Sequence, residues 1–487
     1  MPLTHNRALG FGLLLLVAGR VGLLLFSLLS TGLMTRDLGP HGFGDYRAAV
    51  GYLGMIVLLA DLGLASIFVR EISVPNADYN RVVGSAISLR LVLACTSIAA
   101  ALALVFALPF TDEARQAALW AAPGFLAYSL HLMIFGLFQQ KMKQSQVIMA
   151  EITGAIVLVA AVVALWGRGA SAAAFCGALS LSYVTTLAIA LFHARRHASL
   201  VPRFDPAEWS RLLRASVPLA VGTTMTIAIY QSPTLLLAMF TTPEVVGNYG
   251  VPQKIFDSLM GIGLLTIGLA APLLANAAAS DGERFAGVVR GGLQTMLLGG
   301  TALALVLASS APFVVAVVAG PAFTDSASTL QLFALLFVIH TCSLFLREAA
   351  TAMHLQNRIA WRVAPAMAIA FVGFATLIPR YGGNGAVLAL IVSETFLLFN
   401  FLRLLRGRLS VRLPPGVFAK LAAAGLIAAA LVYACQVREL SWWLTTALVL
   451  PAYGVILLAV GSVAIRDIQQ LAAKLHGRLR GGGLQGG

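Results

Sequence analysis

The sequence predicts an all-α polytopic membrane protein, with 14 transmembrane helices in two six-helix lobes and two C-terminal helices. Of its 487 residues, 59% are apolar and only 11% are charged, and the mean hydropathy is +0.89. Soluble domains contain about 45–50% apolar and about 25% charged residues, so this composition excludes a soluble protein. The apolar residues form successive runs of roughly 18–28 residues, each long enough to cross a hydrocarbon core of about 30 Å as a helix.

Proline and glycine pairs separate the apolar runs, as at Gly39-Pro40, Gly320-Pro321 and Pro414-Pro415. No stretch between the runs is long enough for a soluble domain of about 100 residues. The predicted spans are 9–34, 46–69, 83–109, 116–138, 147–166, 170–193, 212–239, 245–273, 286–310, 327–353, 362–378, 383–404, 416–436 and 441–464. The first of these is interpreted as a membrane helix rather than a removed signal, because Arg20 interrupts its apolar run.

Several enzyme classes lack their usual motifs in this chain. It contains no GxxxxGK(S/T), HExxH or CxxC pattern, which argues against ATP-driven pumping and zinc chemistry. Cys95, Cys176, Cys342 and Cys435 each stand alone in an apolar run and are interpreted as core residues rather than disulfide partners. We therefore expect no cofactor and no metal.

The net charge of +14 is explained by the placement of the basic residues. When successive loops are assigned to alternate sides, most of the 33 lysines and arginines fall on the side that carries both termini. By the positive-inside rule both termini of this multi-pass protein are predicted to be cytoplasmic. Basic residues at the cytoplasmic ends of helices meet anionic lipid headgroups, so nucleic acid is not expected as a partner. The opposite side holds Arg36, Arg47, Arg115, Arg168, Arg380 and Arg438.

Two short patterns recur at one spacing. Gly44-Asp45-Tyr46 is matched by Gly247-Asn248-Tyr249, and the D-x-x-R-x-x-G pattern that starts at Asp78 returns at Asp281, both at an offset of 203 residues. We infer an internal repeat of six helices. Because six is even, the halves have the same orientation and are related by a pseudo-two-fold axis along the membrane normal, with the substrate site between them and alternating access by rocking. The predicted parts are an N-lobe at 1–203, a C-lobe at 204–412, two further helices at 413–465 and a cytoplasmic basic, Gly-rich tail at 466–487.

The segment from Thr35 to Tyr46, TRDLGPHGFGDY, is followed by Asp61-Leu62-Gly63-Leu64 and by Val69-Arg70-Glu71-Ile72. These residues resemble the R-x-L-G-P-x-x-F-G-x-Y loop, the D-x-G-L segment and the R-E element of the polysaccharide-type (Wzx-like) oligosaccharide flippases. That family belongs to the multidrug/oligosaccharidyl-lipid/polysaccharide (MOP) exporter superfamily. Val246-Gly247-Asn248-Tyr249 is similar to its V-G-x-Y element.

The resemblance implies a flippase of the bacterial inner membrane. Such a protein moves an undecaprenyl-pyrophosphate-linked oligosaccharide from the cytoplasmic to the periplasmic leaflet, for capsule, exopolysaccharide or O-antigen synthesis. The implied partners are this lipid-linked glycan, membrane lipids, and polysaccharide polymerase and export machinery. Such a cargo has an anionic pyrophosphate, a polar glycan and an apolar tail. A suitable carrier therefore needs a cationic, water-filled cavity, and the sequence should contain cations within its membrane helices.

Three cations are candidates for contact with the substrate. Arg20 lies within the first helix, where a lipid-facing arginine costs about 2.5–3.5 kcal/mol, so it should face a cavity or pair with an acid. Lys254 and Asp257 are three residues apart and hence on one helix face, either as a self-neutralised pair or as a tuned cavity cation. Arg47, at the outer end of the second helix, is either an interfacial anchor or a substrate contact.

Acidic residues within the helices are candidates for ion coupling. Glu394 lies near the middle of its predicted helix, where an ionised carboxylate is costly, so it either couples ion movement to transport or is a satisfied buried acid. Asp61 and Asp257 are the other candidates. Asp61, together with Glu151 and Glu348 near helix ends, also fits capping or salt bridging.

His131 and His340 fall in equivalent helices of the predicted halves and are candidates for a polar lining. Tyr249 and Tyr128 are candidates to stack on sugars or to hydrogen-bond with them. Buried histidines bonded to the backbone, and tyrosines in the core or in an interfacial belt, are the commoner cases.

Two other functions compete with the flippase. An ion-coupled multidrug or metabolite exporter of the related multidrug-extrusion type shares the architecture, but organic cations suit acidic cavities better. A membrane polymerase or ligase should need a substantial outer loop with catalytic residues, and the longest predicted outer connection is only about 15 residues, near 311–326.

Overall fold

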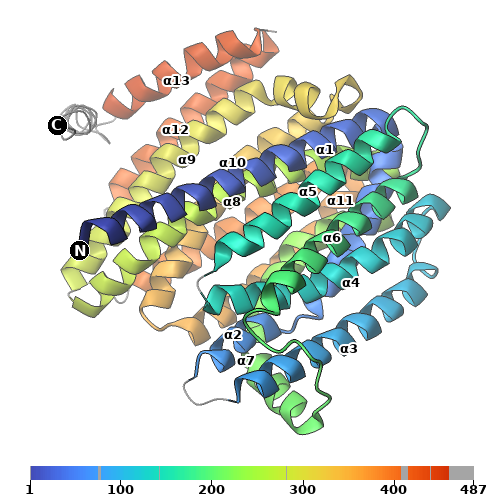
Figure 1. Cartoon of the computed structure of the whole chain (residues 1–487). Coiled ribbons are helices and arrows are strands. Elements are labelled where there is room, and N and C mark those ends of the chain that lie inside the picture. Colours follow the sequence, from blue (N-terminus) through green and yellow to red (C-terminus); the bar gives the residue numbers. More distant parts are fainter. Residues whose placement is uncertain are drawn as a thin grey trace, which may run out of the picture. The chain divides into compact units, whose positions relative to one another are not determined.

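The computed structural model describes residues 2–74, 78–141, 143–280, 282–406, 415–438 and 440–459, and within them every regular element is a helix (Figure 1). The elements are α1 (Pro2–Leu59), α2 (Leu64–Ile72), α3 (Tyr79–Val105), α4 (Asp112–Gln140), α5 (Gln144–Leu165), α6 (Ala172–Ala194), α7 (Pro206–Phe240), α8 (Pro243–Ser280), α9 (Gly282–Ala319), the short 3-10 helix η1 (Pro321–Phe323), α10 (Ser326–Ala352), α11 (Gln356–Arg406), α12 (Pro415–Val437) and α13 (Trp442–Ala459).

Within the described ranges, nine helices are long and apolar enough to cross a membrane. The predicted all-α membrane fold is therefore confirmed, whereas the number of 14 transmembrane helices stays a prediction. The predicted basic tail at 466–487 lies outside the described residues.

Left-handed glycines explain where the observed helices depart from the predicted spans. α1 runs through the expected joint with a kink at Gly39 (φ 63°), and α11 does the same at Gly382 (φ 53°). The predicted span 46–69 is instead interrupted, because Leu62 and Gly63 have φ values of 47° and 71°, which no α-helix accommodates. α1 therefore ends at Leu59, and α2 begins at Leu64.

The chain divides into two compact units, each with its own core. The first contains the described residues up to Leu259, Val315–Thr329 and Gln356–Leu397. One buried cluster in this unit joins the helices from α2 to α7 around Phe68, Leu89 and Leu137. In this unit, α5 and α6 pack against each other and α6 packs against α4 (Figure 1).

The second unit contains Met260–Val314, Leu330–Leu355 and the described residues from Leu398 onward. Leu305 of α9, Ala424 and Ala428 of α12, and Val449 of α13 form part of its core. The lobe boundaries expected from the sequence repeat stay a prediction.

The two repeated Gly-x-Tyr segments meet each other within the first unit. A Cβ atom added at Gly44 would lie 1.8 Å from the carbonyl oxygen of Pro243, and one added at Gly247 would lie 2.1 Å from the carbonyl oxygen of Pro40. Pro40 and Pro243 are themselves 203 residues apart, so each copy of the motif supplies both a glycine and a carbonyl to the other copy. We call this reciprocal contact the glycine seam.

The polar residue after each seam glycine holds the start of another helix. The hydroxyl of Thr111, which caps α4, donates to Asp45 Oδ1 at 2.5 Å. The hydroxyl of Ser326, the first residue of α10, donates to Asn248 Oδ1 at 3.0 Å and to the Asn248 carbonyl at 2.8 Å. Since Asp45 and Asn248 are equivalent in the repeat, both copies tie a following helix to the glycine seam in a similar way.

The first D-x-x-R-x-x-G pattern fastens the connection between α6 and α7 onto α3. Asp78 caps α3 by accepting the Arg81 backbone N–H at 3.2 Å, and the Arg81 guanidinium contacts Asp205 Oδ2 at 2.6 Å. Gly84 accepts the Arg203 N–H at 3.1 Å, with the Val201 carbonyl only 2.6 Å from where a Cβ would stand. Backbone N–H groups of α7 and the Arg81 side chain hold the pKa of Asp205 below its usual value. The second copy begins at Asp281, which lies outside the described residues.

The glycine seam yields a stability prediction. Gly44→Ala or Gly247→Ala should lower the free energy of unfolding by about 2 kcal/mol or more, because the new methyl group overlaps a backbone carbonyl that has little room to move. Thermal unfolding of the purified protein in detergent measures the loss.

Gly261→Ala on α8 is the matched control, since an added Cβ there meets nothing within 4 Å. Its free energy of unfolding should stay unchanged or rise by up to about 1 kcal/mol through helix propensity. Equal melting temperatures for all three variants would contradict the close contact at the seam.

Candidate functional site

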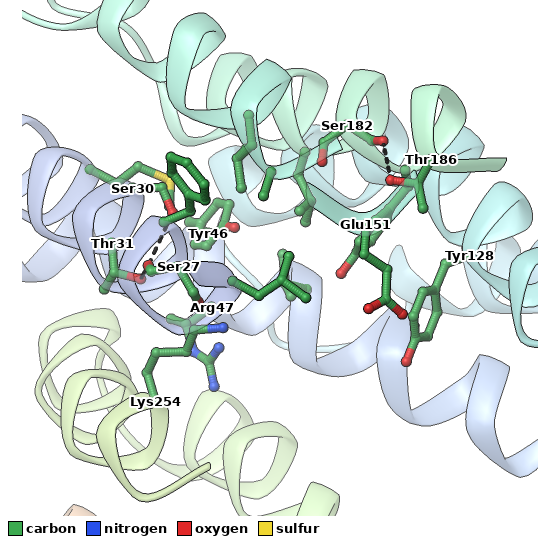
Figure 2. A pocket seen from close by; sticks show the side chains of 18 of the residues that line it. Ser27, Ser30, Thr31, Tyr46, Arg47, Tyr128, Glu151, Ser182, Thr186 and Lys254 are labelled. Carbon is green, nitrogen blue, oxygen red and sulfur yellow. Dashed lines mark hydrogen bonds between the residues drawn. The ribbon is translucent and has the colours of Figure 1, made fainter. Parts of the chain in front are cut away.

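A cavity of about 480 Å³ opens within the first unit (Figure 2). Five helices line it: α1, α4, α5, α6 and α8. The polar and charged lining residues are Arg20, Ser27, Ser30, Thr31, Tyr46, Arg47, Tyr128, His131, Glu151, Ser182, Tyr183, Thr186 and Lys254. All of them except Lys254 precede residue 187, so the wall comes mainly from the first half of the chain.

Small residues allow three of these helices to approach one another closely. A Cβ added at Gly124 of α4 would lie 2.5 Å from Ser180 Cα of α6, and one at Gly154 of α5 would lie 1.9 Å from Thr186 Oγ1 of α6. Small residues at helix interfaces are the usual means of tight packing in membranes, where no hydrophobic force drives helices together. This packing fixes the positions of the polar side chains that α4, α5 and α6 carry.

Arg47 and Lys254 lie together on one part of the cavity wall (Figure 2). Arg47 Nη2 donates to Gln253 Oε1 at 2.6 Å, and its Nε is buried without a hydrogen-bond acceptor. Among the described residues, no acceptor or acid lies within hydrogen-bond or ion-pair distance of the Lys254 ammonium, although the Asp257 carboxylate attracts both Lys254 and Arg47 from farther away. Cations with unused donors that face a cavity have the chemistry that an anion would need, and the predicted role of Arg47 and Lys254 with a substrate stays a prediction.

Arg20 and Glu151 form an ion pair elsewhere on the same wall. Arg20 Nη1 lies 3.0 Å from Glu151 Oε2, and His131 Nε2 lies 3.6 Å from the other carboxylate oxygen. The Arg20 side chain is 46% exposed, so the pair remains accessible from the cavity. Both alternatives for Arg20 are therefore observed at once, since it lines the cavity and also pairs with an acid.

Two tyrosines form an aromatic face near this ion pair. The rings of Tyr128 and Tyr183 stack with centroids 5.1 Å apart, and Phe125 meets both edge-on at 6.3 Å and 5.8 Å. Ser182 and Thr186 of α6 donate to helix carbonyls at 2.7 Å and 2.9 Å, and their oxygens line the cavity beside the rings.

The structure thus brings together five of the residues selected from the sequence: Arg20, Arg47, Tyr128, His131 and Lys254. Their role with a substrate stays a prediction. The other candidates, Asp61, Tyr249, Asp257, His340 and Glu394, are not among the residues that line this cavity.

Asp61 forms a buried ion pair away from the cavity. Its Oδ1 lies 2.8 Å from Nη1 of Arg90, whose side chain is 1% exposed, and Arg90 Nε also donates to the Ser129 carbonyl at 3.2 Å. This contact joins the helix break at Leu62 to α3 and α4. Of the two alternatives for Asp61, ion coupling and salt bridging, the observed contact is the salt bridge.

The remaining candidates have separate surroundings. Glu394 is buried in α11 and accepts a hydrogen bond from the Tyr230 hydroxyl of α7. Tyr249 is buried against Gly383, and His340 is partly exposed on α10 in the second unit. Asp257 is exposed, and among the described residues no ion pair within 4 Å joins it to Lys254. Their predicted parts in ion coupling and polar lining stay predictions.

Glu151 and Tyr183 are the site residues that the sequence reasoning undervalued or missed. The predicted span 147–166 puts Glu151 close to a helix end. In the structure α5 begins at Gln144, which sets Glu151 two turns inside the helix, where it contacts Arg20. Tyr183 lies in the cluster Ser182, Tyr183 and Thr186, whose spacing of one and four residues puts polar groups on one side of an apolar helix. That pattern was the available signal.

Solved structures with the same arrangement of helices are membrane transporters. The lipid II flippase MurJ in an inward closed conformation matches with a TM-score of 0.73 and 12% identity, over 93% of this chain and 98% of that one. An inward-facing multidrug resistance MATE family transporter of the MOP superfamily matches with a TM-score of 0.63 and 15% identity, over 80% and 94% of the two chains.

A MOP superfamily transporter from Pyrococcus furiosus matches with a TM-score of 0.52 and 15% identity, over 80% of this chain and 95% of that one. That protein is described as having a binding pocket of reverse polarity that suggests a different function. At these identities the matches establish the fold alone. A comparison with curated proteins gave no match.

The chain is thus a multi-pass membrane protein with the fold of the MOP superfamily transporters and flippases. The sequence model of one family, described as polysaccharide biosynthesis protein, matches residues 10–275, more than half of the chain. The chain belongs to this polysaccharide biosynthesis protein family, and the predicted family relationship is confirmed.

The buried ion pair yields a second prediction. Asp61→Ala should lower the free energy of unfolding by about 3–5 kcal/mol, because it leaves the Arg90 guanidinium buried without a counter-charge. Asp112→Ala is the control: it removes the exposed partner of Arg115 and should cost less than about 1 kcal/mol. Thermal unfolding in detergent compares the two variants, and an equal effect would refute the structural importance of the Asp61–Arg90 pair.

Proposed function

We propose that this protein is a flippase that carries undecaprenyl-pyrophosphate-linked oligosaccharide repeat units from the cytoplasmic to the periplasmic leaflet for polysaccharide assembly. The observation that carries this proposal is the charge of the cavity wall. Among its described lining residues, Arg20, Arg47 and Lys254 face a single carboxylate, that of Glu151. A cavity with this excess of positive charge favours an anionic cargo.

The pyrophosphate is the group that the cations would hold. Since Glu151 already neutralises Arg20, Arg47 and Lys254 are the cations with donors free for phosphate oxygens. Charge-assisted hydrogen bonds to phosphate from a guanidinium and an ammonium would replace the water that the anion loses on entering the cavity. The polyprenyl tail, which is apolar, would stay in the surrounding lipid.

Membership of the polysaccharide biosynthesis family supports this cargo, and so does the shared fold with a lipid II flippase. Movement would follow alternating access of the cavity between the two leaflets, in a protein of the bacterial inner membrane with both termini in the cytoplasm. Arg20 and His131 would contribute to the cavity wall, and Glu394 and Asp257 to ion coupling. Polysaccharide polymerase and export proteins would take the product.

The alternative is an ion-coupled multidrug or metabolite exporter, which the shared fold with MATE transporters favours. The charge of the cavity opposes it, because an excess of positive charge repels organic cations. The Pyrococcus furiosus transporter described by its reverse pocket polarity supports using the sign of a pocket to distinguish functions within this fold.

Deleting the gene in a host whose sugar pathway is intact tests the proposal. Complete lipid-linked repeat units should accumulate and surface polysaccharide should disappear, as measured by mass spectrometry of extracted polyprenyl lipids and by a polysaccharide assay. Unchanged lipid-linked sugars together with reduced export of a small molecule would establish the exporter instead.

Complementation with variants tests the anion site. The double variant Arg47→Ala, Lys254→Ala should lower the rate of polysaccharide export about 10-fold or more, because the pyrophosphate loses two charge-assisted contacts. Arg168→Ala, which removes an exposed loop arginine away from the cavity, is the control and should complement fully. Normal export by the double variant, at equal membrane abundance, would remove both cations from the mechanism.

A further inference from the structure

The wall of the cavity has two chemically different ends. Arg47 and Lys254 lie together at one end, beside Ser27 and Thr31, whereas Tyr128 and Glu151 lie apart from them, near Ser182 and Thr186 (Figure 2). We call the second region the aromatic end and define it by Arg20, Tyr128, His131, Glu151, Ser182, Tyr183 and Thr186.

The aromatic end carries little net charge. Arg20 and Glu151 neutralise each other at 3.0 Å, and the third ionisable partner is an imidazole, His131, 3.6 Å from the same carboxylate. The Arg20 guanidinium is in direct contact with a carboxylate, whereas the Arg47 guanidinium donates to the neutral amide oxygen of Gln253. A pyrophosphate would be attracted less strongly here than by Arg47 and Lys254. The aromatic end therefore suits a part of the cargo that is polar but uncharged.

The aromatic face is rigid before any ligand arrives. Tyr128 and Tyr183 stack on each other and Phe125 supports both rings edge-on, while Gly124 and Gly154 bring their helices into close contact. A face that is already ordered binds without the entropy cost of fixing loose side chains.

Aromatic rings beside paired polar groups match the chemistry of a sugar ring. A pyranose presents C–H groups on its faces, which lie against aromatic rings, and hydroxyl groups around its edge. Glu151 accepts hydrogen bonds from such hydroxyls, Arg20 donates to them, and Ser182 and Thr186 add neutral oxygens. A sugar bearing a carboxylate would instead be repelled by Glu151 and would find Arg20 already paired.

We propose that the aromatic end is a binding subsite for an uncharged sugar, a hexose or N-acetylated hexosamine, of the glycan that the cations hold by its pyrophosphate. This subsite rests on the proposed flippase function, because both ends belong to one cavity and would bind two parts of one ligand. The protein then selects its cargo by the glycan as well as by the pyrophosphate that all such lipids share.

Binding measurements on the full chain in lipid nanodiscs, by native mass spectrometry, test the subsite. The probes are undecaprenyl pyrophosphate, its glucosyl conjugate and its glucuronosyl conjugate. The wild type should bind the glucosyl conjugate about 10-fold more tightly than bare undecaprenyl pyrophosphate. Its affinity for the glucuronosyl conjugate should exceed that for the bare lipid by a distinctly smaller factor.

Tyr183→Leu keeps an apolar side chain but removes the aromatic face, so the glucosyl preference should fall to about 2-fold or less. Its affinity for bare undecaprenyl pyrophosphate should be unchanged, which also verifies folding. Tyr128→Leu is a second, independent variant with the same expectation. Arg47→Ala should lower the affinity for all three lipids by the same factor, so that the ratios between their affinities are preserved.

The outcomes separate the two proposals. Equal affinity of the wild type for bare and glucosyl lipids overturns the sugar subsite while leaving the flippase intact, as does a full glucosyl preference in both tyrosine variants. If the wild type binds the glucuronosyl conjugate as tightly as the glucosyl conjugate, the restriction to uncharged sugars is overturned. Failure of the wild type to bind any of the three lipids overturns the proposed function, and the subsite with it.

Discussion

A charge inside a membrane helix is tolerated only where another group compensates it, and this constraint organises the first unit. Arg90 is held by Asp61, Arg20 by Glu151, and the carboxyl group of Glu394 by the hydroxyl of Tyr230. Each contact joins parts of the chain that are distant in sequence, so compensation of charge also fixes the packing of the helices. Arg47 and Lys254 line the cavity without a direct contact to a carboxylate, and the charge nearest to compensating them is that of Asp257.

The aromatic end and the cationic end differ because their charges are compensated differently. On α5, Glu151 supplies an internal counter-ion to Arg20, and no carboxylate among the described lining residues does the same for Arg47 or Lys254. One helix therefore decides which part of the cavity stays available to an external anion. The proposal that the pyrophosphate binds at one end of the cavity and the sugar at the other follows from the position of that single acid.

Composition and hydropathy were sufficient to predict an all-α membrane fold, because the cost of exposing the backbone to lipid leaves few alternatives. The same reasoning selected Arg20 and Lys254, since a cation in an apolar run needs a partner or a cavity. It did not predict the contact of Arg20 with Glu151, 131 positions away, because that contact depends on how α1 packs against α5.

Asp61 shows the same limit of sequence reasoning. Its neighbours predicted a continuous helix, whereas left-handed backbone at Leu62 and Gly63 ends that helix and sets the carboxylate against Arg90. Tyr183 was not selected because a tyrosine in an apolar helix is ordinary, and only the stack with Tyr128 distinguishes it. Contacts of this kind are set by tertiary packing, and local sequence patterns do not predict them.

The glycine seam also constrains how the gene can change over time. Each copy of the motif provides a glycine that leaves room for a backbone carbonyl of the other copy. A substitution at one of these glycines therefore requires a compensating change in the other copy. A larger residue at Gly44 would demand a shifted Pro243, and one at Gly247 a shifted Pro40. Substitutions at these four positions should therefore be inherited together, and chimaeras that join halves from diverged relatives should fail first at this point.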